Sequence, residues 1–165
     1  MDNEFKIRPA AVRDYPLLGE VLFDAVRNGP SPYSDTQRLM WAPAPRNGQD
    51  WERRLKSQTV MVAESKTDIV GFMSLTADGV IDFAYLRPSF RGYGLFRRLY
   101  ESIEEAAIAA RRPTLTVHAS LMAEPAFSKM GFTVCRRESI DLADETLDRF
   151  LMQKHLSVVT MQFSH

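Results

Sequence analysis

Apolar and polar positions along the first 60 residues predict a short strand, an amphipathic helix and an irregular insert. Residues 4–10, EFKIRPA, alternate as a strand does. Asp14 is a candidate N-cap for a helix whose apolar residues recur at intervals of three and four, namely Leu17, Leu18, Val21, Leu22 and Ala25. Residues 28–48 are rich in Pro, Gly, Ser and Asn and predict a loop with a short helix at 35–40. Asp50 is a candidate cap for the next helix, over residues 51–58.

Three apolar runs follow, and they predict an antiparallel meander. TVMVAES (59–65) and IVGFMSLT (69–76) are separated by KTD, which fits a hairpin turn, and GVIDFAYLRP (79–88) is the third run. Strict alternation within the third run places Asp82, Ala84 and Leu86 on one face, with Ile81, Phe83 and Tyr85 on the other.

The pattern changes to a helical period at Gly94 and continues to Ala110, where two arginines and Pro113 end the helix. TLTVHAS (114–120) predicts a strand parallel to the third run, because a helix of crossover length separates them. A helix is predicted at 122–130, and residues 132–140 and 146–156 predict a closing hairpin. The fold class expected from this order is α+β, in three layers, with a mixed and mostly antiparallel sheet between helices.

Composition narrows the class of protein. The chain has 165 residues, enough for one ordinary domain, and its 21 basic and 21 acidic side chains cancel. Neither a nucleic-acid partner nor a membrane partner is expected, because no basic field and no long apolar run is present. The N-terminus lacks the apolar core of a signal peptide, so a cytoplasmic location is predicted. Cys135 is the single cysteine, and no metal site is expected.

The stretch RPSFRGYGLFRRLY (87–100) carries the most specific chemistry. A glycine turn between a strand and a helix presents free backbone N–H groups that suit a phosphate or pyrophosphate. A nucleoside-triphosphate loop needs Gly-Lys-Ser/Thr at the helix start, but the chain has Gly94, Leu95 and Phe96. A dinucleotide fingerprint needs a third glycine where Arg97 stands and an acidic residue about twenty positions later. Both ligand classes are therefore disfavoured, and coenzyme A is the third candidate.

At these residues the sequence resembles the GNAT family of N-acetyltransferases. The family pattern Gln/Arg-x-x-Gly-x-Gly/Ala corresponds here to Arg91, Gly92, Tyr93, Gly94, Leu95 and Phe96, with Phe96 in place of a small residue. A second family pattern, a polar strand end followed by Ala, an aromatic residue and Gly-Phe, corresponds to Ser120, Ala123, Phe127, Gly131 and Phe132. The resemblance extends over about residues 5–156. It implies one N-acetyltransferase-like domain over residues 1–165, with 157–165 as a C-terminal tail and a sheet splayed between its fourth and fifth strands.

The resemblance also implies acetyl-CoA as co-substrate and a set of cofactor-binding residues. The amides from Arg91 to Phe96 would hold the pyrophosphate, where the helix dipole opposes its charge. The strand end at Tyr85 and Leu86 would offer backbone groups to the pantetheine arm, and the amide of Leu86 would stabilise the charge developing on the thioester oxygen. Phe127 lies where many family members have a tyrosine beside the sulfur of coenzyme A.

The acid and the base remain open at this level. Phenylalanine cannot donate a proton, so Ser120, a backbone group or water is left for the leaving thiolate. Asp82 is the best single candidate for the base, because a carboxylate on the fourth strand is common in the family; a structural partner of Arg87 or His118 is the alternative. Tyr33 and Trp41, in the insert, are candidates for the acceptor pocket, whereas Trp51 is expected in the core.

The function implied is direct transfer of an acetyl group to a primary amine of a small molecule or peptide. Direct attack is favoured because Cys135 is expected on a core-like strand and offers no usable nucleophile. The alternative is a non-catalytic acyl-CoA-binding or interaction module, which Phe96 and Phe127 suggest. The family is often dimeric, so a homodimer is a further possibility.

Overall fold

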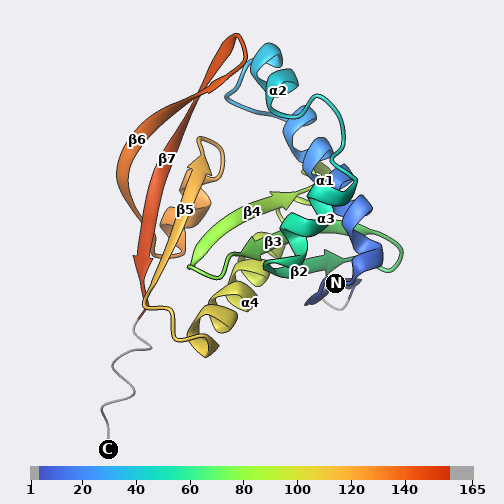
Figure 1. Cartoon of the computed structure of the whole chain (residues 1–165), viewed down its shortest axis with the longest axis vertical. Helices are drawn as coiled ribbons and strands as arrows, with labels where there is room; N and C mark the ends of the chain where they lie inside the picture. The colour runs from blue at the N-terminus through green and yellow to red at the C-terminus, as the bar shows by residue number, and fades with distance from the viewer. Residues whose placement is uncertain (1–3, 157–165) are drawn as a thin grey trace, which may run out of the picture.

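A seven-stranded mixed sheet forms the centre of the computed structural model, which describes residues 4–156 (Figure 1). Its strands lie in the order β1-β2-β3-β4-β5-β7-β6. Their bounds are β1 (Lys6–Pro9), β2 (Thr59–Glu64), β3 (Ile69–Leu75), β4 (Val80–Leu86), β5 (Thr114–Ser120), β6 (Thr133–Leu142) and β7 (Glu145–His155). Within the described residues, β4 and β5 pair in parallel and the other strand pairs are antiparallel. The predicted meander, the parallel pair and the closing hairpin are confirmed.

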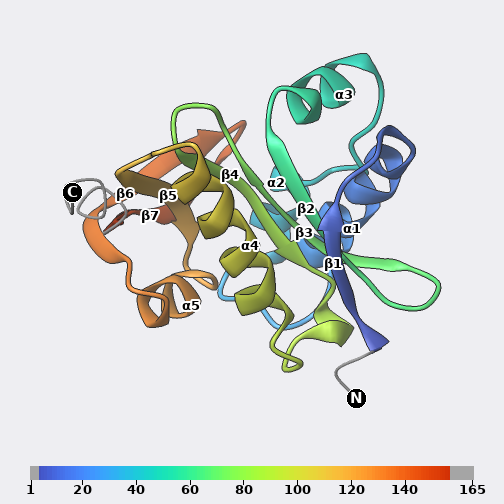
Figure 2. The same ribbon diagram turned by 90° about the horizontal axis from the view of Figure 1, so that it is seen from below.

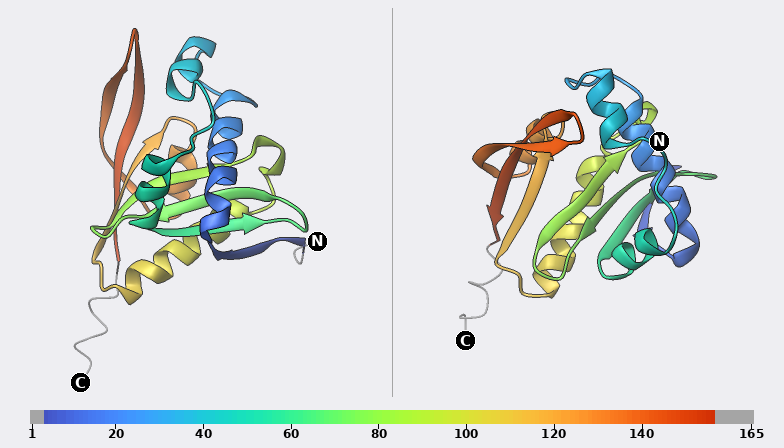
Figure 3. Two further views of the ribbon diagram at one scale, coloured as in Figure 1. Left: turned by 45° about the vertical axis from the view of Figure 1, so that its right-hand side comes forward. Right: turned by 45° about the horizontal axis from the view of Figure 1, so that its top comes forward.

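Helices cover both faces of the sheet, as the views in Figure 2 and Figure 3 show. They are α1 (Tyr15–Arg27), α2 (Asp35–Trp41), α3 (Gln49–Lys56), α4 (Leu95–Ala109) and α5 (Glu124–Lys129). On one face, α4 buries Leu95, Leu99 and Ile103 against β2 to β5. On the other face, α1 and α3 form a second core with Trp51 and Phe72. The predicted three-layer α+β fold is confirmed.

The parallel pair β4–β5 is the shortest strand pairing in the sheet. Its register contains two pairs of residues, Val80 with Thr116 and Ile81 with Val117. Beyond Ile81 the strands diverge, so the ends of β4 and β5 have no partner on their facing edges (Figure 1). This is the predicted splay between the fourth and fifth strands, and it opens the space in which the site lies.

A β-bulge in β4 corrects the alternation predicted from the sequence. Leu75 faces Ile81 and Met73 faces Ala84, so Ser74 lies opposite both Asp82 and Phe83. Ile81 packs in the core beneath α4, as Ala84 and Leu86 do, whereas Phe83 and Tyr85 pack on the α1 and α3 side. Asp82 also turns to the α3 side, because the extra residue reverses the pleat.

Two predicted helix caps are wrong in detail. Asp14 occupies the N-cap position of α1 without a side-chain cap bond; its carboxylate accepts from Arg8 (2.8 Å) and from the Ala11 amide (2.7 Å) instead. The helix α3 begins after Gly48, so Asp50 lies inside its first turn. The carboxylate of Asp14 binds Arg8 instead of the helix amides, and the earlier start of α3 places Asp50 beyond the cap position.

The last strands also differ from expectation at Cys135, which is exposed on the edge strand β6 rather than buried in a core-like strand. The predicted tail, residues 157–165, lies outside the described residues. Among residues 4–156, no helix is both long enough and apolar enough to span a bilayer.

Candidate active site

The glycine corner between β4 and α4 requires glycine for its backbone conformation. Gly92 has φ +92° and Gly94 has φ +77°, values that side-chain-bearing residues rarely adopt. Gly94 is the N-cap of α4 and offers no side chain to the helix, so the first amides of α4 have no partner within the helix. A Cβ placed on either glycine would meet no atom within 4 Å. The corner therefore presents N–H groups and the positive end of a helix dipole to open space.

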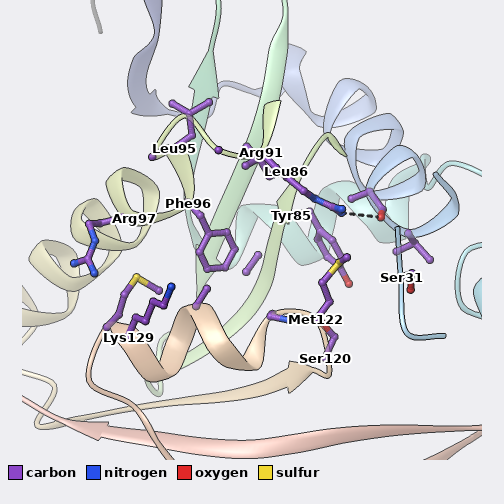
Figure 4. A pocket seen from close by; sticks show the side chains of 18 of the residues that line it. Ser31, Tyr85, Leu86, Arg91, Leu95, Phe96, Arg97, Ser120, Met122 and Lys129 are labelled. Carbon is purple, nitrogen blue, oxygen red and sulfur yellow. Dashed lines mark hydrogen bonds between the residues drawn. The ribbon is translucent and has the colours of Figure 1, made fainter. Parts of the chain in front are cut away.

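A cavity of about 490 Å³ lies against this corner, in the opening between β4 and β5 (Figure 4). The ends of both strands, the corner, α4, α5, α1 and the α1–α2 loop all contribute to it. Its lining consists of Ala25, Val26, Ser31, Tyr33, Trp41, Ala84, Tyr85, Leu86, Arg91, Gly92, Gly94, Leu95, Phe96, Arg97, Ser120, Met122, Ala123, Ala126, Lys129 and Met130. Seven expected cofactor-binding residues and both expected acceptor residues thus share one cavity with Ser120, whereas Tyr93 and Phe127 are not in its lining.

The hydrogen-bond ladder between β3 and β4 fixes which backbone groups face the opening. The amide of Arg87 donates to Val70 O (2.8 Å), so the next pair inward, Leu86 with Gly71, is non-hydrogen-bonded. The same alternation makes Ala84 with Met73 a non-hydrogen-bonded pair. The N–H and C=O groups of Ala84 and Leu86 therefore point away from β3, into the opening. Those of Tyr85 point toward β3, so Tyr85 contributes its side chain rather than its backbone.

Basic side chains line the part of the cavity nearest α4 and α5. Figure 4 shows Arg97 and Lys129 on one side of the cavity, opposite Tyr85 and Ser31. Arg91 turns toward the last turns of α1, where its guanidinium donates to Ala25 O (3.5 Å). Burial and the nearby charge of Arg38 lower the pKa of Arg91. Arg91 was expected from the sequence as a cofactor-binding residue, whereas Arg97 and Lys129 were not among the predicted site residues.

The two residues that depart from the family pattern, Phe96 and Phe127, contact one another. Their rings pack edge to face with the centroids 5.4 Å apart. The ring of Phe127 makes a second such contact with Phe132, with the centroids 5.1 Å apart. Phe127 is fully buried and Phe96 lies in the cavity wall between it and the opening. The ring of Phe96 therefore separates residue 127 from the space that a tyrosine hydroxyl would need to reach.

Ser120, at the end of β5, brings a hydroxyl to the cavity. Its Oγ accepts from the Ala123 amide (3.0 Å), which leaves its own O–H available to donate. Tyr33 has less freedom, because its hydroxyl donates to Asp148 O (2.6 Å) and accepts from the Leu121 amide (2.8 Å). Tyr33 thus joins the α1–α2 loop to β7 and to the end of β5 while its ring lines the cavity.

Trp41 and Tyr85 form the aromatic part of the lining with Tyr33. The ring of Trp41 lies 5.5 Å from that of Tyr33 and 6.2 Å from that of Tyr85. Burial raises the pKa of Tyr85 to about 12, against the opposing effect of the Arg46 charge. The Tyr85 phenol is therefore neutral near pH 7. Trp51 is in the core, as expected, with its indole N–H bonded to Tyr15 O at 2.7 Å.

Asp82 lies behind the cavity, on the α3 side of β4, and is not part of the lining. Its carboxylate accepts from Arg54 (2.8 and 2.9 Å) and from Gln58 (2.6 Å). Burial raises the pKa of Asp82, but the hydrogen bonds from Arg54 and Gln58 outweigh burial and lower it. His118 is also absent from the lining, and its Nδ1 lies 2.6 Å from Glu138 Oε1. Neither residue directly faces the opening between the strands.

Comparisons with known proteins agree with this geometry. A family model described as an acetyltransferase (GNAT) domain matches residues 32–156. An uncharacterized N-acetyltransferase, YafP, of Escherichia coli is 26% identical over 152 residues, covering 92% of this chain and 96% of that protein.

Solved structures share the fold. A GCN5-related N-acetyltransferase from Rhodopseudomonas palustris has a TM-score of 0.83 and 27% identity, covering 92% of this chain and 95% of that one. A Salmonella typhimurium acetyltransferase solved with acetyl-CoA, yncA, has a TM-score of 0.66 and 20% identity, covering 93% and 94%. At that identity the second likeness concerns the fold alone.

Proposed function

This chain belongs to the acetyltransferase (GNAT) family and is an acetyl-CoA-dependent N-acetyltransferase, and we propose that it acetylates a primary amine of a small molecule or peptide by direct transfer. The observation that carries the proposal is the meeting of two features in one cavity. One is the glycine corner with the free amides of α4, and the other is the outward-facing backbone of Ala84 and Leu86.

The cofactor fits these groups by charge and by hydrogen-bonding pattern. The amides from Arg91 to Phe96, with Arg97 and Lys129 nearby, would hold the pyrophosphate and the remaining phosphate charge. The backbone of Ala84 and Leu86 would pair with the amides of the pantetheine arm as a neighbouring strand does. Of these two amides, Leu86 is our candidate donor to the thioester oxygen, where negative charge develops during attack.

Direct transfer is supported by what the cavity wall contains. No cysteine is among its lining residues, and Cys135 is exposed on β6, away from the opening. The neutral amine nitrogen would attack the thioester carbon, the bond from carbon to sulfur would break, and the amine would lose one proton to water. The leaving thiolate would accept a hydrogen bond from Ser120. Asp82 as base stays a prediction, and from its position it could act on the amine only through water.

Thermal unfolding and thiol release test the proposal together. Acetyl-CoA should raise the melting temperature while NAD and ATP should not, because binding to the folded state alone stabilises it. Free thiol should then be released when amines from a panel are added. Initial rates measured with both substrates varied should give the intersecting lines of a ternary-complex mechanism. Stabilisation by NAD or ATP instead would contradict the proposed binding mode, and a ping-pong pattern would contradict direct transfer.

A cytoplasmic location and a homodimer also stay predictions, which fractionation and light scattering would check.

A further inference from the structure

One end of the cavity is aromatic and fixed in position. We define the aromatic end as Tyr33, Trp41 and Tyr85, which line the cavity together with Met122. The two hydrogen bonds of the Tyr33 hydroxyl hold its ring, and Trp41 packs edge to face on it at an interplanar angle of 88°. The ring of Tyr85 lies 6.2 Å from that of Trp41, with the two ring planes tilted by 59°. These rings offer edges and faces to a ligand without the entropic cost of ordering long side chains.

The aromatic end lacks an available negative charge. No Asp or Glu is among the described residues that line the cavity. Three carboxylates lie near the lining from outside it, and each is paired: Asp24 with Arg87 at 3.0 Å, Asp82 with Arg54 at 2.8 Å and Asp148 with Arg137 at 2.8 Å. An acceptor with a second ammonium group would therefore place a charge in the cavity without a free carboxylate to pair with it, which is unfavourable in a site shielded from water.

The basic groups of the lining are better matched to the cofactor than to the acceptor. Arg97 and Lys129 lie across the cavity from Tyr85, beside the start of α4 (Figure 4). Arg91 belongs to the glycine corner and its guanidinium is directed to the carbonyl of Ala25. The four negative charges of coenzyme A can engage these cations, which leaves the aromatic end to apolar contacts.

We propose that the acceptor is a small aromatic primary monoamine whose ring packs against Trp41, Tyr33 and Tyr85 with its nitrogen toward the thioester site beside Leu86. This inference rests on the proposed function and specifies its substrate class. The cavity supports a small acceptor, because about 490 Å³ must hold both the pantetheine end and the amine.

The test measures amine affinity for the complex with coenzyme A by calorimetry. Four probes are compared: benzylamine, cyclohexylmethylamine of similar shape without a π system, spermidine and glutamate. Benzylamine should bind about tenfold more tightly than each of the others. Aromatic contacts add to simple apolar burial, and the additional charged groups of spermidine and glutamate would have no oppositely charged partner left in the cavity. Trp41→Leu should remove the preference of benzylamine over cyclohexylmethylamine, and Trp41→Phe should retain it.

Trp51→Phe is the matched control, because Trp51 is the second tryptophan of the chain and lies in the core rather than in the cavity. It should lower the melting temperature and leave the ranking of amines unchanged. Equal or tighter binding of spermidine or glutamate would overturn the inference, as would an unchanged ranking in Trp41→Leu. Acetylation of spermidine in preference to benzylamine would leave the proposed function intact and remove only the substrate class. Failure of coenzyme A itself to bind would instead remove the proposed function, and the inference with it.

Discussion

Ser120 carries a cavity hydroxyl whose proton is free to donate, since its Oγ already accepts from the Ala123 amide. We expect Ser120→Ala to lower kcat about tenfold with little change in the KM for acetyl-CoA, because the lost bond forms to the leaving thiolate. Steady-state thiol release measures both constants. Ser120→Thr keeps a hydroxyl and should retain most of the activity. Equal activity of the Ala and Thr variants would exclude Ser120 from this role.

Asp82 tests the choice between a base and a structural residue. Its bonds to Arg54 and Gln58 indicate that Asp82→Asn should lower the free energy of unfolding by about 1 kcal/mol, since the ion pair is partly exposed and screened. If the role is structural, the pH profile of kcat/KM should keep its shape. Loss of the acidic limb of that profile, without loss of stability, would support the base predicted from the sequence.

At the scale of single residues, the sequence identified which residues line the site but not which way their side chains and backbone groups face. The pattern located Arg91, Ser120, Tyr33 and Trp41, all of which line one cavity. It could not reveal the β-bulge at Asp82, because the extra residue is visible only in the register with β3. It also could not reveal that Tyr85 presents its side chain rather than its backbone to the cavity, since that depends on which pairs of the ladder are hydrogen-bonded.

The element that controls cofactor binding is the corner before α4. Gly94 has φ +77° and open space at the Cβ position, so Gly94→Ala should cost about 1 kcal/mol of backbone energy without a clash. We expect the Kd for acetyl-CoA, measured by calorimetry, to rise about tenfold, because the free amides at the start of α4 would be displaced. Gly48→Ala is the matched control: Gly48 also has a positive φ and open space, but it lies outside the cavity. Equal weakening by both variants would contradict a local effect at the corner.

The α1–α2 loop is held over the cavity by Tyr33. Tyr33→Phe keeps the ring but leaves the Leu121 amide and Asp148 O without this partner, so the free energy of unfolding should fall by about 1–3 kcal/mol. Chemical denaturation measures this loss. The KM for the amine should rise more than the KM for acetyl-CoA, because the loop contributes to the aromatic end. An unchanged KM for the amine would show that the ring alone fixes that end.

Elements were the most predictable level of the fold. Sequence patterns predicted β2 to β7 and α4 to within a few residues. Most of these segments bury apolar residues at a regular spacing, whereas β3 is buried at every position and β6 has no buried residue. Ends and caps were less predictable. Asp14 and Asp50 have the right chemistry for a cap, but the tertiary contact with Arg8 and the earlier start at Gly48 decided their roles.

Across the whole molecule, several carboxylates are stabilised in their charged form. Hydrogen bonds from Arg8 lower the pKa of Asp14 and of Glu64, and the bond from His118 lowers that of Glu138. A folded-state pKa below the unfolded value contributes stability that is present above the unfolded pKa and is lost as pH falls through the folded pKa. The melting temperature should therefore be level between pH 6 and 5 and fall below about pH 4. Arg8→Gln should flatten this decline; an unchanged decline would mean that other groups cause it.

The contact between Phe96 and Phe127 restricts how this protein can change by mutation. Phe127→Tyr alone would bury a hydroxyl in an apolar cluster, and Phe96→Ala alone would leave a void beside the corner. A tyrosine at 127 becomes useful only after residue 96 has become small, so each single step is costly and the double change is the viable one. The two positions form an epistatic pair, and among related sequences a large residue at 96 should accompany phenylalanine at 127.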